Sequence, residues 1–530
     1  MSFETRERDL LGRIGRLKTK SGTVETPALL PVLNPAIQPV PPERMRQEFG
    51  FEALITNAYI LKQNFQNRPV EEGIHKFLNF NGVIMTDSGA YQTLVYGDVA
   101  TNPEEIVSYQ EQIDTDVATI LDIPTGWKVT EKKAERTVRE TLKRARDLFE
   151  SKTRDDILWV GPVQGGKYLN LVAESARQLN RLPFHINALG SPTEVMERYR
   201  FDILAEMIMA AKMNLHSEKP LHLFGAGHPF MFTLAVALGC DLFDSAAYAL
   251  YARENRYMTE NGTYRLDELA HFPCSCPRCS SSTPKQALEL EQGQRIIFLA
   301  EHNLYASNAE VKRIKQAIRD GRLWEHLEMR AHSHPALLQA VKTLAKHEEF
   351  IEKHSPATKK SGLFFFNSIG QMRPEVVHYR RMLEQRYAQP DETTTLLLFP
   401  QTRTKPFHKS QEYRRIAKAF KQQSRAEKEN HTCFYAAPFG VIPIELDEVY
   451  PLSQHDIVLP LDKETVAYVA DQIVEYINRS SYKKVILIDD RETWDKTVET
   501  LCRKACVRKR MSFETFNLKK ALSGMTLSTK

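Results

Sequence analysis

The chain is sparing with cysteine and has no long apolar segment. Only 7 of its 530 residues are cysteine, an odd number that is mostly scattered, which argues against a disulfide framework and fits a reducing compartment. No apolar run approaches the roughly 20 residues that span a bilayer, and the opening MSFETRERDLLGR has no apolar signal core. We therefore expect a cytoplasmic protein with no membrane partner, and neither a secreted scaffold nor a membrane protein.

Excess charge of one sign is also small. The net charge of +5 does not by itself indicate a nucleic-acid partner, and the hydrophobic content of 42% and charged content of 26% are those of an ordinary globular protein. The basic residues are nevertheless concentrated in the runs KKAERTVRETLKRAR, RRIAKAFKQQSRAEK and RKACVRKR. Such runs are more often solvated helix faces than phosphate-binding surfaces.

Short apolar runs recur through the first half of the chain and end in small or polar residues. They are TPALLPV, ALITN, GVIMTD, VATILD, ILWVGPVQ, PFHINALG, PLHLFGAG and DLFD. Most are separated by amphipathic helical segments such as PEEIVSYQEQI. Eight such strands, buried on both faces and alternating with helices, predict a closed (β/α)₈ TIM barrel of the α/β class. An open doubly wound sheet is the alternative.

Polar residues and glycines stand where these expected strands end. They are Asn57, Asp87, Asp122, Gln164, Gly190, the turn from Gly225 to Gly227, and Asp244. Active sites of (β/α)₈ barrels lie at the carboxyl ends of the strands, so three carboxylates and an amide are expected to converge on one rim. Each residue alone also suits a helix cap or a turn, but that explanation is weaker for the whole set.

The pattern changes after Asp244. A cysteine-rich loop and long helices follow, and then a polar, proline-containing stretch leads to the strand-like runs TLLLFP, CFYAAPFGVIP and KKVILIDD. We expect a catalytic barrel domain over 1–350 with a zinc-binding subdomain at about 265–325, and a helical extension and linker over 351–387. A smaller C-terminal α/β domain is expected over 388–530.

The segment FPCSCPRCS concentrates three of the seven cysteines. Cys274, Cys276 and Cys279 form a C-x-C-x₂-C pattern, and His302 follows in LAEHNLYA, a predicted helix. Three thiolates and an imidazole suit one tetrahedral Zn²⁺, and four protein ligands leave no position open for water, so the ion would be structural. His271 is the alternative fourth ligand. The remaining cysteines, Cys240, Cys433, Cys502 and Cys506, are predicted to be core residues or to have no particular role.

Several segments together carry a family resemblance. VIMTDSGAYQ, ILDIP, VQGG, HLFGAGHP, DLFDSAAYALYARENRYMTENGTYRLDEL and FPCSCPRC followed by His302 resemble the tRNA-guanine transglycosylases. The likeness, over about residues 5–385, is to the archaeal branch, which replaces guanine at position 15 of tRNA with 7-cyano-7-deazaguanine on the way to archaeosine. The resemblance implies a (β/α)₈ barrel with a zinc insertion, and a homodimer that binds tRNA, guanine and 7-cyano-7-deazaguanine.

The resemblance also assigns catalytic roles to two of the rim residues. Asp244 matches the nucleophile that attacks the ribose C1′, and Asp87 matches the general acid and base that assists departure of one base and entry of the other. The logic is that of a retaining glycosidase, in which a covalent intermediate splits one displacement into two. One of the pair must spend part of the cycle protonated, so we expect the surroundings of Asp87 to raise its pKa.

The other family positions concern base recognition. Asp122 and Gln164 match residues that hydrogen-bond the purine edge, and a carboxylate and an amide suit a guanine-like face. Tyr91 and Phe224 are candidates for stacking on the base, although an aromatic beside an apolar strand is usually a core residue. Gly190 and Gly225 complete the predicted substrate site, because glycine lets the backbone approach a ligand closely.

The C-terminal region departs from the family pattern. Archaeal enzymes commonly carry an RNA-binding PUA module, whose Gly-rich strand pattern is not recognisable here. FPQTRTKPFHKS and FGVIPIELDEVYPLSQHD instead resemble a domain shared by archaeosine synthases and the C-terminal regions of archaeal transglycosylases. Archaeosine synthases have a cysteine where this chain has Gln401. Arg403, Lys405, His408 and Lys409 form a basic loop that either meets phosphates or is simply solvated.

Base exchange in tRNA is thus the expected function, with two alternatives left open. One is an archaeosine synthase-like modification of the inserted base, which Gln401 disfavours. The other is a non-catalytic tRNA-binding partner subunit, against which the presence of both Asp87 and Asp244 argues.

Overall fold

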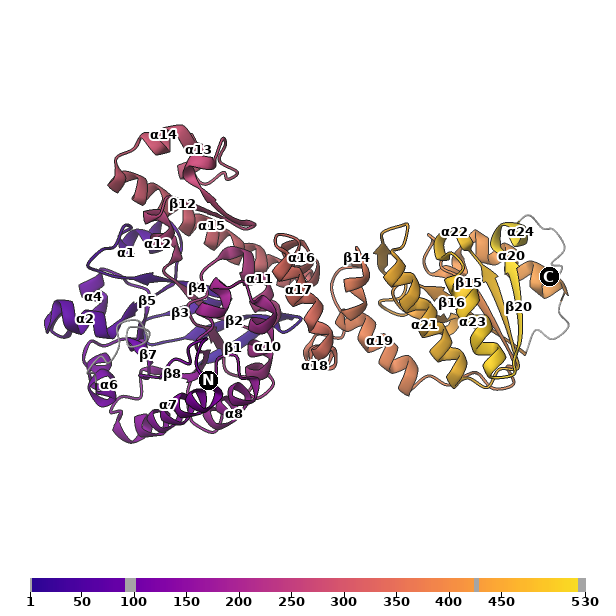
Figure 1. Ribbon diagram of the computed structural model, residues 1–530, viewed down its shortest axis with the longest axis horizontal. Coiled ribbons are helices and arrows are strands. Elements are labelled where there is room, and N and C mark those ends of the chain that lie inside the picture. Colours follow the sequence, from indigo (N-terminus) through magenta and orange to yellow (C-terminus); the bar gives the residue numbers. More distant parts are fainter. Residues whose placement is uncertain (1, 91–101, 424–428, 523–530) are drawn as a thin grey trace. The chain divides into compact units, whose positions relative to one another are not determined.

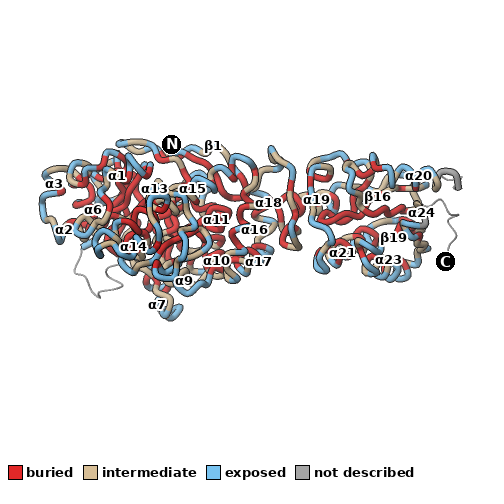
Figure 2. The backbone as a smooth tube through the Cα atoms, turned by 90° about the horizontal axis from the view of Figure 1, so that it is seen from above, coloured by how far each residue is buried: buried red, intermediate tan, exposed pale blue. Residues whose placement is uncertain are grey.

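The computed structural model describes residues 2–90, 102–423 and 429–522, without the side chains of 421–423 and 520. It divides into two compact units, Met1–His347 and Glu348–Lys530, and each is described by itself (Figure 1). In both units buried strands lie inside a layer of more exposed residues (Figure 2).

Eight parallel strands close into a barrel in the first unit, in the order β10-β11-β4-β5-β6-β7-β8-β9. The strands are β4 (Ala28–Leu33), β5 (Ala53–Asn57), β6 (Val83–Asp87), β7 (Val117–Thr119), β8 (Leu158–Val163), β9 (Ile186–Leu189), β10 (Leu221–Leu223) and β11 (Leu242–Ser245). Each of the eight apolar runs in the sequence overlaps one of them. The predicted (β/α)₈ barrel is therefore confirmed, and the open doubly wound sheet is wrong.

Helices surround the barrel (Figure 1). They include α1 (Pro42–Gln47), α2 (Ala58–Phe65), α3 (Arg68–Glu72), α4 (Ile74–Leu78), α6 (Pro103–Gln112), α7 (Glu131–Ser151), α8 (Leu169–Leu179), α9 (Thr193–Glu197), α10 (Phe201–Lys212), α11 (Pro229–Ala237) and α12 (Ala247–Arg253). On α7, apolar residues recur every three or four positions and are buried, among them Ala134, Val138 and Leu142. This spacing gives the helix one face for the barrel and leaves the opposite face to solvent.

A three-stranded antiparallel sheet, β1 (Phe3–Asp9), β2 (Gly12–Lys18) and β3 (Thr23–Thr26), packs against one end of the barrel. Its residues Phe3, Leu17 and Val24 share an apolar cluster with the barrel interior. Ala53 and Val83, which belong to the same cluster, are the first residues of β5 and β6. The amino ends of the strands are thus filled by hydrocarbon, and the polar chemistry is confined to their carboxyl ends.

A buried ion pair joins this sheet to the barrel. Arg13 of β2 donates from Nε to Asp241 Oδ1 at 2.8 Å and from Nη2 to Asp241 Oδ2 at 2.9 Å, and Asp241 immediately precedes β11. The side chains are 3% and 1% exposed. Such a bidentate pair fixes both partners strongly, because either charge left alone in the interior would be costly.

An insertion follows β11 and α12. It begins with the hairpin of β12 (Arg256–Thr259) and β13 (Gly262–Arg265) and continues through α13 (Pro277–Ser280), α14 (Pro284–Glu289) and the long helix α15 (Gln292–Asp320). The remaining helices of the unit are α16 (Leu323–Ala331) and α17 (Pro335–Thr343).

The second unit contains a five-stranded sheet in the order β17-β16-β15-β19-β20. Its strands are β15 (Thr395–Pro400), β16 (Asn430–Ala436), β17 (Gly440–Pro443), β19 (Lys484–Asp489) and β20 (Ser512–Asn517), parallel except for β17 against β16. The other elements are α18 (Glu348–His354), β14 (Leu363–Phe365), α19 (Pro374–Gln385), α20 (Gln411–Gln423), β18 (His455–Ile457), α21 (Lys463–Arg479), α22 (Arg491–Trp494), α23 (Thr497–Arg508) and α24 (Leu518–Leu522). The expected C-terminal α/β fold is confirmed.

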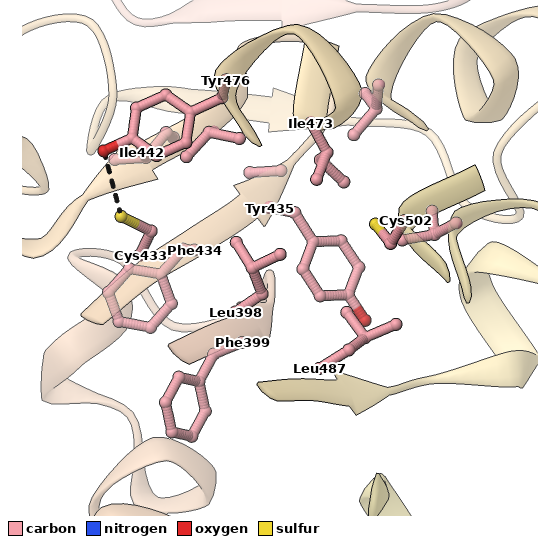
Figure 3. Packing of buried hydrophobic residues seen from close by; sticks show 14 of the residues in the cluster. Leu398, Phe399, Cys433, Phe434, Tyr435, Ile442, Ile473, Tyr476, Leu487 and Cys502 are labelled. Carbon is pink, nitrogen blue, oxygen red and sulfur yellow. Dashed lines mark hydrogen bonds between the residues drawn. The ribbon is translucent and has the colours of Figure 1, made fainter. Parts of the chain in front are cut away.

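The core of this sheet is apolar and contains three cysteines. Leu398, Tyr435 and Leu487 come from three adjacent strands and lie side by side, and the Cys433 thiol donates to the hydroxyl of Tyr476 at 3.8 Å (Figure 3). The four cysteines outside FPCSCPRCS are buried free thiols, as predicted: Cys240, Cys433, Cys502 and Cys506. No helix in the described parts of the chain is long and apolar enough to cross a membrane.

The Arg13–Asp241 pair gives a test of how the sheet is attached. Asp241→Asn should lower the free energy of unfolding by roughly 3–5 kcal/mol, because it leaves the guanidinium buried without a carboxylate. The measurement is urea unfolding followed by circular dichroism. The control is Arg6→Ala, since Arg6 and Glu4 form an exposed pair with side chains 50% and 59% accessible, for which about 0.5 kcal/mol or less is expected. Equal effects of the two substitutions would contradict the assignment.

Candidate active site and metal centre

Three carboxylates meet at the carboxyl end of the barrel. Asp87 is the last residue of β6, Asp244 lies in β11, and Asp122 follows β7. The negative charges of Asp122 and Asp244 both raise the pKa of Asp87, so the three groups share one electrostatic environment. The structure therefore brings these predicted residues together.

The surroundings of Asp87 stabilise its protonated form. Burial is the largest cause, and the neighbouring charges add to it, raising its pKa from 3.8 to about 7, against the opposing N–H groups of Ser88 and Gly89. The Asn57 side-chain amide donates to Asp87 Oδ2 at 2.9 Å and fixes its direction. A carboxyl group with a pKa near neutrality both gives and takes a proton readily.

Asp244 is positioned by two N–H donors on the same oxygen. His222 Nε2 and the backbone N–H of Gly225 each donate to Oδ1 at 2.9 Å. His222 lies in β10 with no exposed surface, and its Nδ1 has no hydrogen-bond partner among the described residues. Within the described parts of the chain Oδ2 receives no such donor, so one oxygen is anchored and the other is left for a ligand.

Glycine is required at position 225. Gly225 has a φ of +62°, in the left-handed region, and a Cβ there would lie 2.6 Å from Thr193 Oγ1. Any other residue would therefore move the N–H that holds Asp244.

Asp122 and Gln164 form one hydrogen-bonded unit. Gln164 Nε2 donates to Asp122 Oδ2 at 2.5 Å, while Gln164 Oε1 accepts from Ser191 Oγ at 2.8 Å and from the N–H of Thr125 at 3.1 Å. Burial raises the pKa of Asp122 to about 6, and the Gln164 amide partly opposes the shift. These contacts fix which end of the Gln164 amide faces Asp122.

Gly190 leaves room for this arrangement. A Cβ at Gly190 would lie 2.2 Å from Gln164 Nε2, so a larger residue would displace the amide. Ser191 beside it has a φ of +63°, a conformation that non-glycine residues rarely adopt, and its hydroxyl links Gln164 to Thr125.

The predicted stacking residues are only partly accounted for. Phe224 is half-buried, packs against the barrel interior and meets the His222 ring edge-on, with centroids 4.8 Å apart. Tyr91 lies outside the described residues. Stacking on a base therefore stays a prediction for both.

Some residues of the site were missed by sequence reasoning. His222 gave a usable signal, because it is a polar residue inside the apolar run PLHLFGAG. Thr125 and Ser191 gave none, since a loop threonine or serine is common and its partner cannot be read from the chain.

Four side chains in the insertion could hold a metal ion. The ligand atoms of Cys274, Cys276, Cys279 and His302 all lie within 4.8 Å of one another. Zn–S bonds of about 2.3 Å in a tetrahedron place sulfurs roughly 3.8 Å apart, so the spacing fits one ion. The alternative ligand His271 is exposed and does not belong to the cluster.

The surroundings of His302 support a role as ligand. Its Nε2 donates to the carbonyl of Met258 at 2.8 Å, which leaves the lone pair of Nδ1 directed at Cys279 Sγ, 3.3 Å away. The Tyr257 ring stacks on the imidazole with centroids 3.6 Å apart. None of the rim carboxylates belongs to this cluster, so the ion would brace the insertion without entering the acidic site.

The basic loop after β15 proves to be largely neutralised. Lys405, His408 and Lys409 each have a carboxylate within 4 Å, namely Asp456 at 3.8 Å, Asp447 at 2.9 Å and Glu448 at 2.7 Å. Gln401 Oε1 accepts from the N–H of Ala437 at 2.9 Å, which is a structural contact. These pairings favour the interpretation as an ordinary loop over a phosphate site.

A barrel with one carboxyl group held by donors on a single oxygen, beside a second carboxyl group whose pKa lies near neutrality, is typical of an enzyme that works through acid–base and covalent chemistry. The family described as Queuine tRNA-ribosyltransferase matches residues 9–336, more than half of the chain. The chain belongs to this family and is a transglycosylase.

Curated relatives match over most of the length. The tRNA-guanine(15) transglycosylase of Saccharolobus solfataricus is 42% identical over 499 residues, 92% of this chain and 96% of the relative. That of Methanocaldococcus jannaschii is 43% identical over 491 residues, 90% of this chain and 72% of the relative. Residues 376–523 match a domain of unknown function (DUF5591).

The raised pKa of Asp87 predicts a pH-dependent stability. Between the unfolded value of 3.8 and the folded value of about 7, the folded chain holds a proton that the unfolded chain has lost. The free energy of unfolding should therefore fall as pH rises through this range. Asp87→Asn should reduce this fall, leaving the part due to Asp122, and should stabilise the protein at pH 8 by on the order of 2 kcal/mol.

Thermal unfolding at pH 5 and pH 8 measures this effect. The exposed Glu135→Gln is the control, and it should keep the wild-type difference between the two pH values. An unchanged difference in Asp87→Asn would show that Asp87 is not held in its protonated form.

Proposed function

We propose that the chain replaces guanine at position 15 of tRNA with 7-cyano-7-deazaguanine, by a double displacement through a covalent Asp244–ribose intermediate. The observation that carries the proposal is the pair of unlike carboxyl groups, with Asp244 held by two N–H donors and Asp87 shifted to a pKa of about 7. The names of the relatives support guanine 15 as the target.

In the first displacement, Asp244 Oδ2 forms a bond to the ribose C1′ while the bond from C1′ to the guanine nitrogen breaks. The departing base carries the electron pair of that bond and takes the proton of Asp87, so no free anion is released. The hydrogen bonds on Oδ1 keep Oδ2 oriented toward the sugar. A base paired or stacked inside folded tRNA must be exposed first, which implies rearrangement of the RNA.

In the second displacement, Asp87 removes a proton from the incoming base, whose nitrogen attacks C1′ as the bond to Asp244 breaks. The configuration at C1′ is inverted twice and so retained, as base exchange requires. The pKa near 7 suits both directions of proton transfer, because Asp87 must be an acid in one half of the cycle and a base in the other.

The Asp122–Gln164 unit would recognise the edge of the base. A carboxylate offers about four lone-pair sites, of which Gln164 takes one, so Asp122 can still accept from N–H groups of a guanine-like ring. Gly190 and Gly225 would let the ring approach the backbone, and Phe224 and Tyr91 would stack on its faces.

The proposal includes a homodimer, as the family resemblance implies.

The ion in the insertion would be Zn²⁺ with a structural role. Three thiolates and one imidazole are the donor set zinc prefers, and four protein ligands leave no open position for water or substrate. The ion would hold the loop that carries Cys274 and Cys276 against His302 of α15. Glu301, the residue before His302, pairs with Arg44 of α1 at 2.6 Å.

Asp244→Asn tests the nucleophile. Incorporation of radiolabelled guanine into tRNA should fall by at least ~10³-fold, because the amide cannot form the covalent intermediate. Wild-type protein mixed with tRNA, without free base, should give a protein–RNA adduct that survives denaturing electrophoresis, and the variant should not. Asp267→Asn, an exposed carboxylate with a 57% accessible side chain, is the control and should retain exchange.

Substantial guanine exchange by Asp244→Asn would eliminate the mechanism. Competition by unlabelled 7-cyano-7-deazaguanine separates the base specificity from the mechanism, since a substrate of this site must suppress labelling.

Metal analysis tests the cluster independently of activity. The wild-type protein should contain one zinc per chain by elemental analysis, whereas His302→Ala and Cys276→Ser should contain less and unfold at lower temperature. Cys240→Ser is the control, because Cys240 is a buried thiol outside the cluster. Full zinc content in His302→Ala would show that another residue completes the site.

A further inference from the structure

One face of α7 carries a line of basic residues. Lys132, Arg136, Arg139, Lys143 and Arg146 are all exposed, and we call them the α7 stripe. At about 100° per residue they fall within an arc of roughly 80°, and 14 steps of 1.5 Å extend the stripe over about 21 Å. This is the first of the basic runs noted in the sequence, and its cations share one side of the helix.

These cations have no ionic partners. Within the described residues, none of the five lies within 4 Å of a carboxylate, although Arg144 on the same helix pairs with Glu140 at 3.1 Å. Glu135 and Asp147 flank the stripe, and Glu150 follows it on the same face of α7, without forming such a pair. Exposed helices that are merely solvated usually interleave charges of both signs, so an unneutralised line indicates a polyanionic partner.

A second group of unpaired cations stands where α7 begins. Trp127 lies in the loop between Asp122 and α7, with Lys167 Nζ 5.1 Å and Arg198 Cζ 5.8 Å from its ring centroid. Neither cation has a carboxylate within 4 Å in the described part of the chain. We call these three residues the Trp127 cluster.

The Trp127 cluster is fixed beside the acidic site. The N–H of Trp127 donates to Glu194 Oε2 at 2.8 Å, and the Tyr168 hydroxyl donates to the carbonyl of Val129 at 2.9 Å, so the loop is tied to both neighbouring segments. Lys167 follows Gln164 by three residues. The cluster therefore lies at the mouth of the barrel, where three carboxylates would otherwise repel a phosphate.

We propose that the α7 stripe and the Trp127 cluster form one track that binds the phosphodiester backbone of the RNA and leads it to the barrel mouth. This inference depends on one part of the proposed function, namely that the substrate is RNA. Lys and Arg contact phosphates, and an accessible indole offers a stacking surface for a base, a combination typical of nucleic-acid grooves. A lipid surface does not fit, because no exposed large hydrophobic residue in the described chain lies on α7.

Salt-dependent affinity tests the stripe. The full-length triple variant Arg136→Ala/Arg139→Ala/Lys143→Ala should bind a full-length tRNA transcript at least ~10-fold more weakly near 0.1 M KCl. The slope of log affinity against log salt should become shallower by about 2, since each lost phosphate contact removes roughly 0.7–0.9. Filter binding between roughly 0.05 and 0.3 M KCl measures both quantities.

A charge-matched control separates the track from general attraction. Lys76→Ala/Lys285→Ala/Lys312→Ala removes three exposed lysines from other elements of the same unit and should change affinity about 2-fold or less. Unchanged affinity in the stripe variant, or an equal loss in the control, would overturn the proposal. If wild-type protein binds through the stripe yet exchanges no guanine, the proposed function fails while the track stands.

Fluorescence tests the Trp127 cluster. The other tryptophans, Trp159, Trp324 and Trp494, are at most 1% exposed, so quenching by iodide reports on Trp127. Saturating tRNA should protect the emission from iodide, and Trp127→Phe should abolish the quenchable fraction. Quenching that tRNA leaves unaltered would remove the cluster from the track.

Discussion

Desolvation of carboxyl groups at the carboxyl end of a closed parallel barrel is the constraint on which the rest of the site depends. Closure brings the ends of β6, β7 and β11 together, and burial then raises the pKa of both Asp87 and Asp122. The three groups are stabilised in different ways. N–H donors hydrogen-bond to Asp244 and Asp122, whereas Asp87 keeps its proton near neutral pH. The hydrogen-bond donors and the proton on Asp87 thus let the three carboxyl groups share one rim.

The barrel and the metal cluster could be predicted because their signals are local. Each strand is a short apolar run that ends in a polar residue, and three thiols within six positions followed by a histidine on a helix is a rare spacing with few explanations. Asp87 and Asp244 could be placed on one rim from strand order alone. The separation of their roles came from family resemblance and not from the residues themselves.

What could not be predicted depends on contacts between distant segments. The hydrogen bond from His222 to Asp244 joins residues 22 positions apart, and Ser191 reaches Gln164 only because its backbone adopts a left-handed conformation. The basic segments show that ion pairing, too, cannot be predicted from the sequence. The loop around His408 proved to be paired with carboxylates, whereas the α7 cations proved to be unpaired, and their sequences do not distinguish the two cases.

The apolar residues Phe3, Leu17 and Val24 pack with the barrel interior and close its amino end, so the carboxyl groups can be reached only from the carboxyl ends of the strands. A released purine can then leave only through the carboxyl end of the barrel, which is also the route by which the incoming base must enter. Under the proposed exchange the two bases occupy the site one after the other. Between these two steps the ribose remains bound covalently to the protein. Ping-pong kinetics would follow, because the first base must leave the shared site before the second base can enter it.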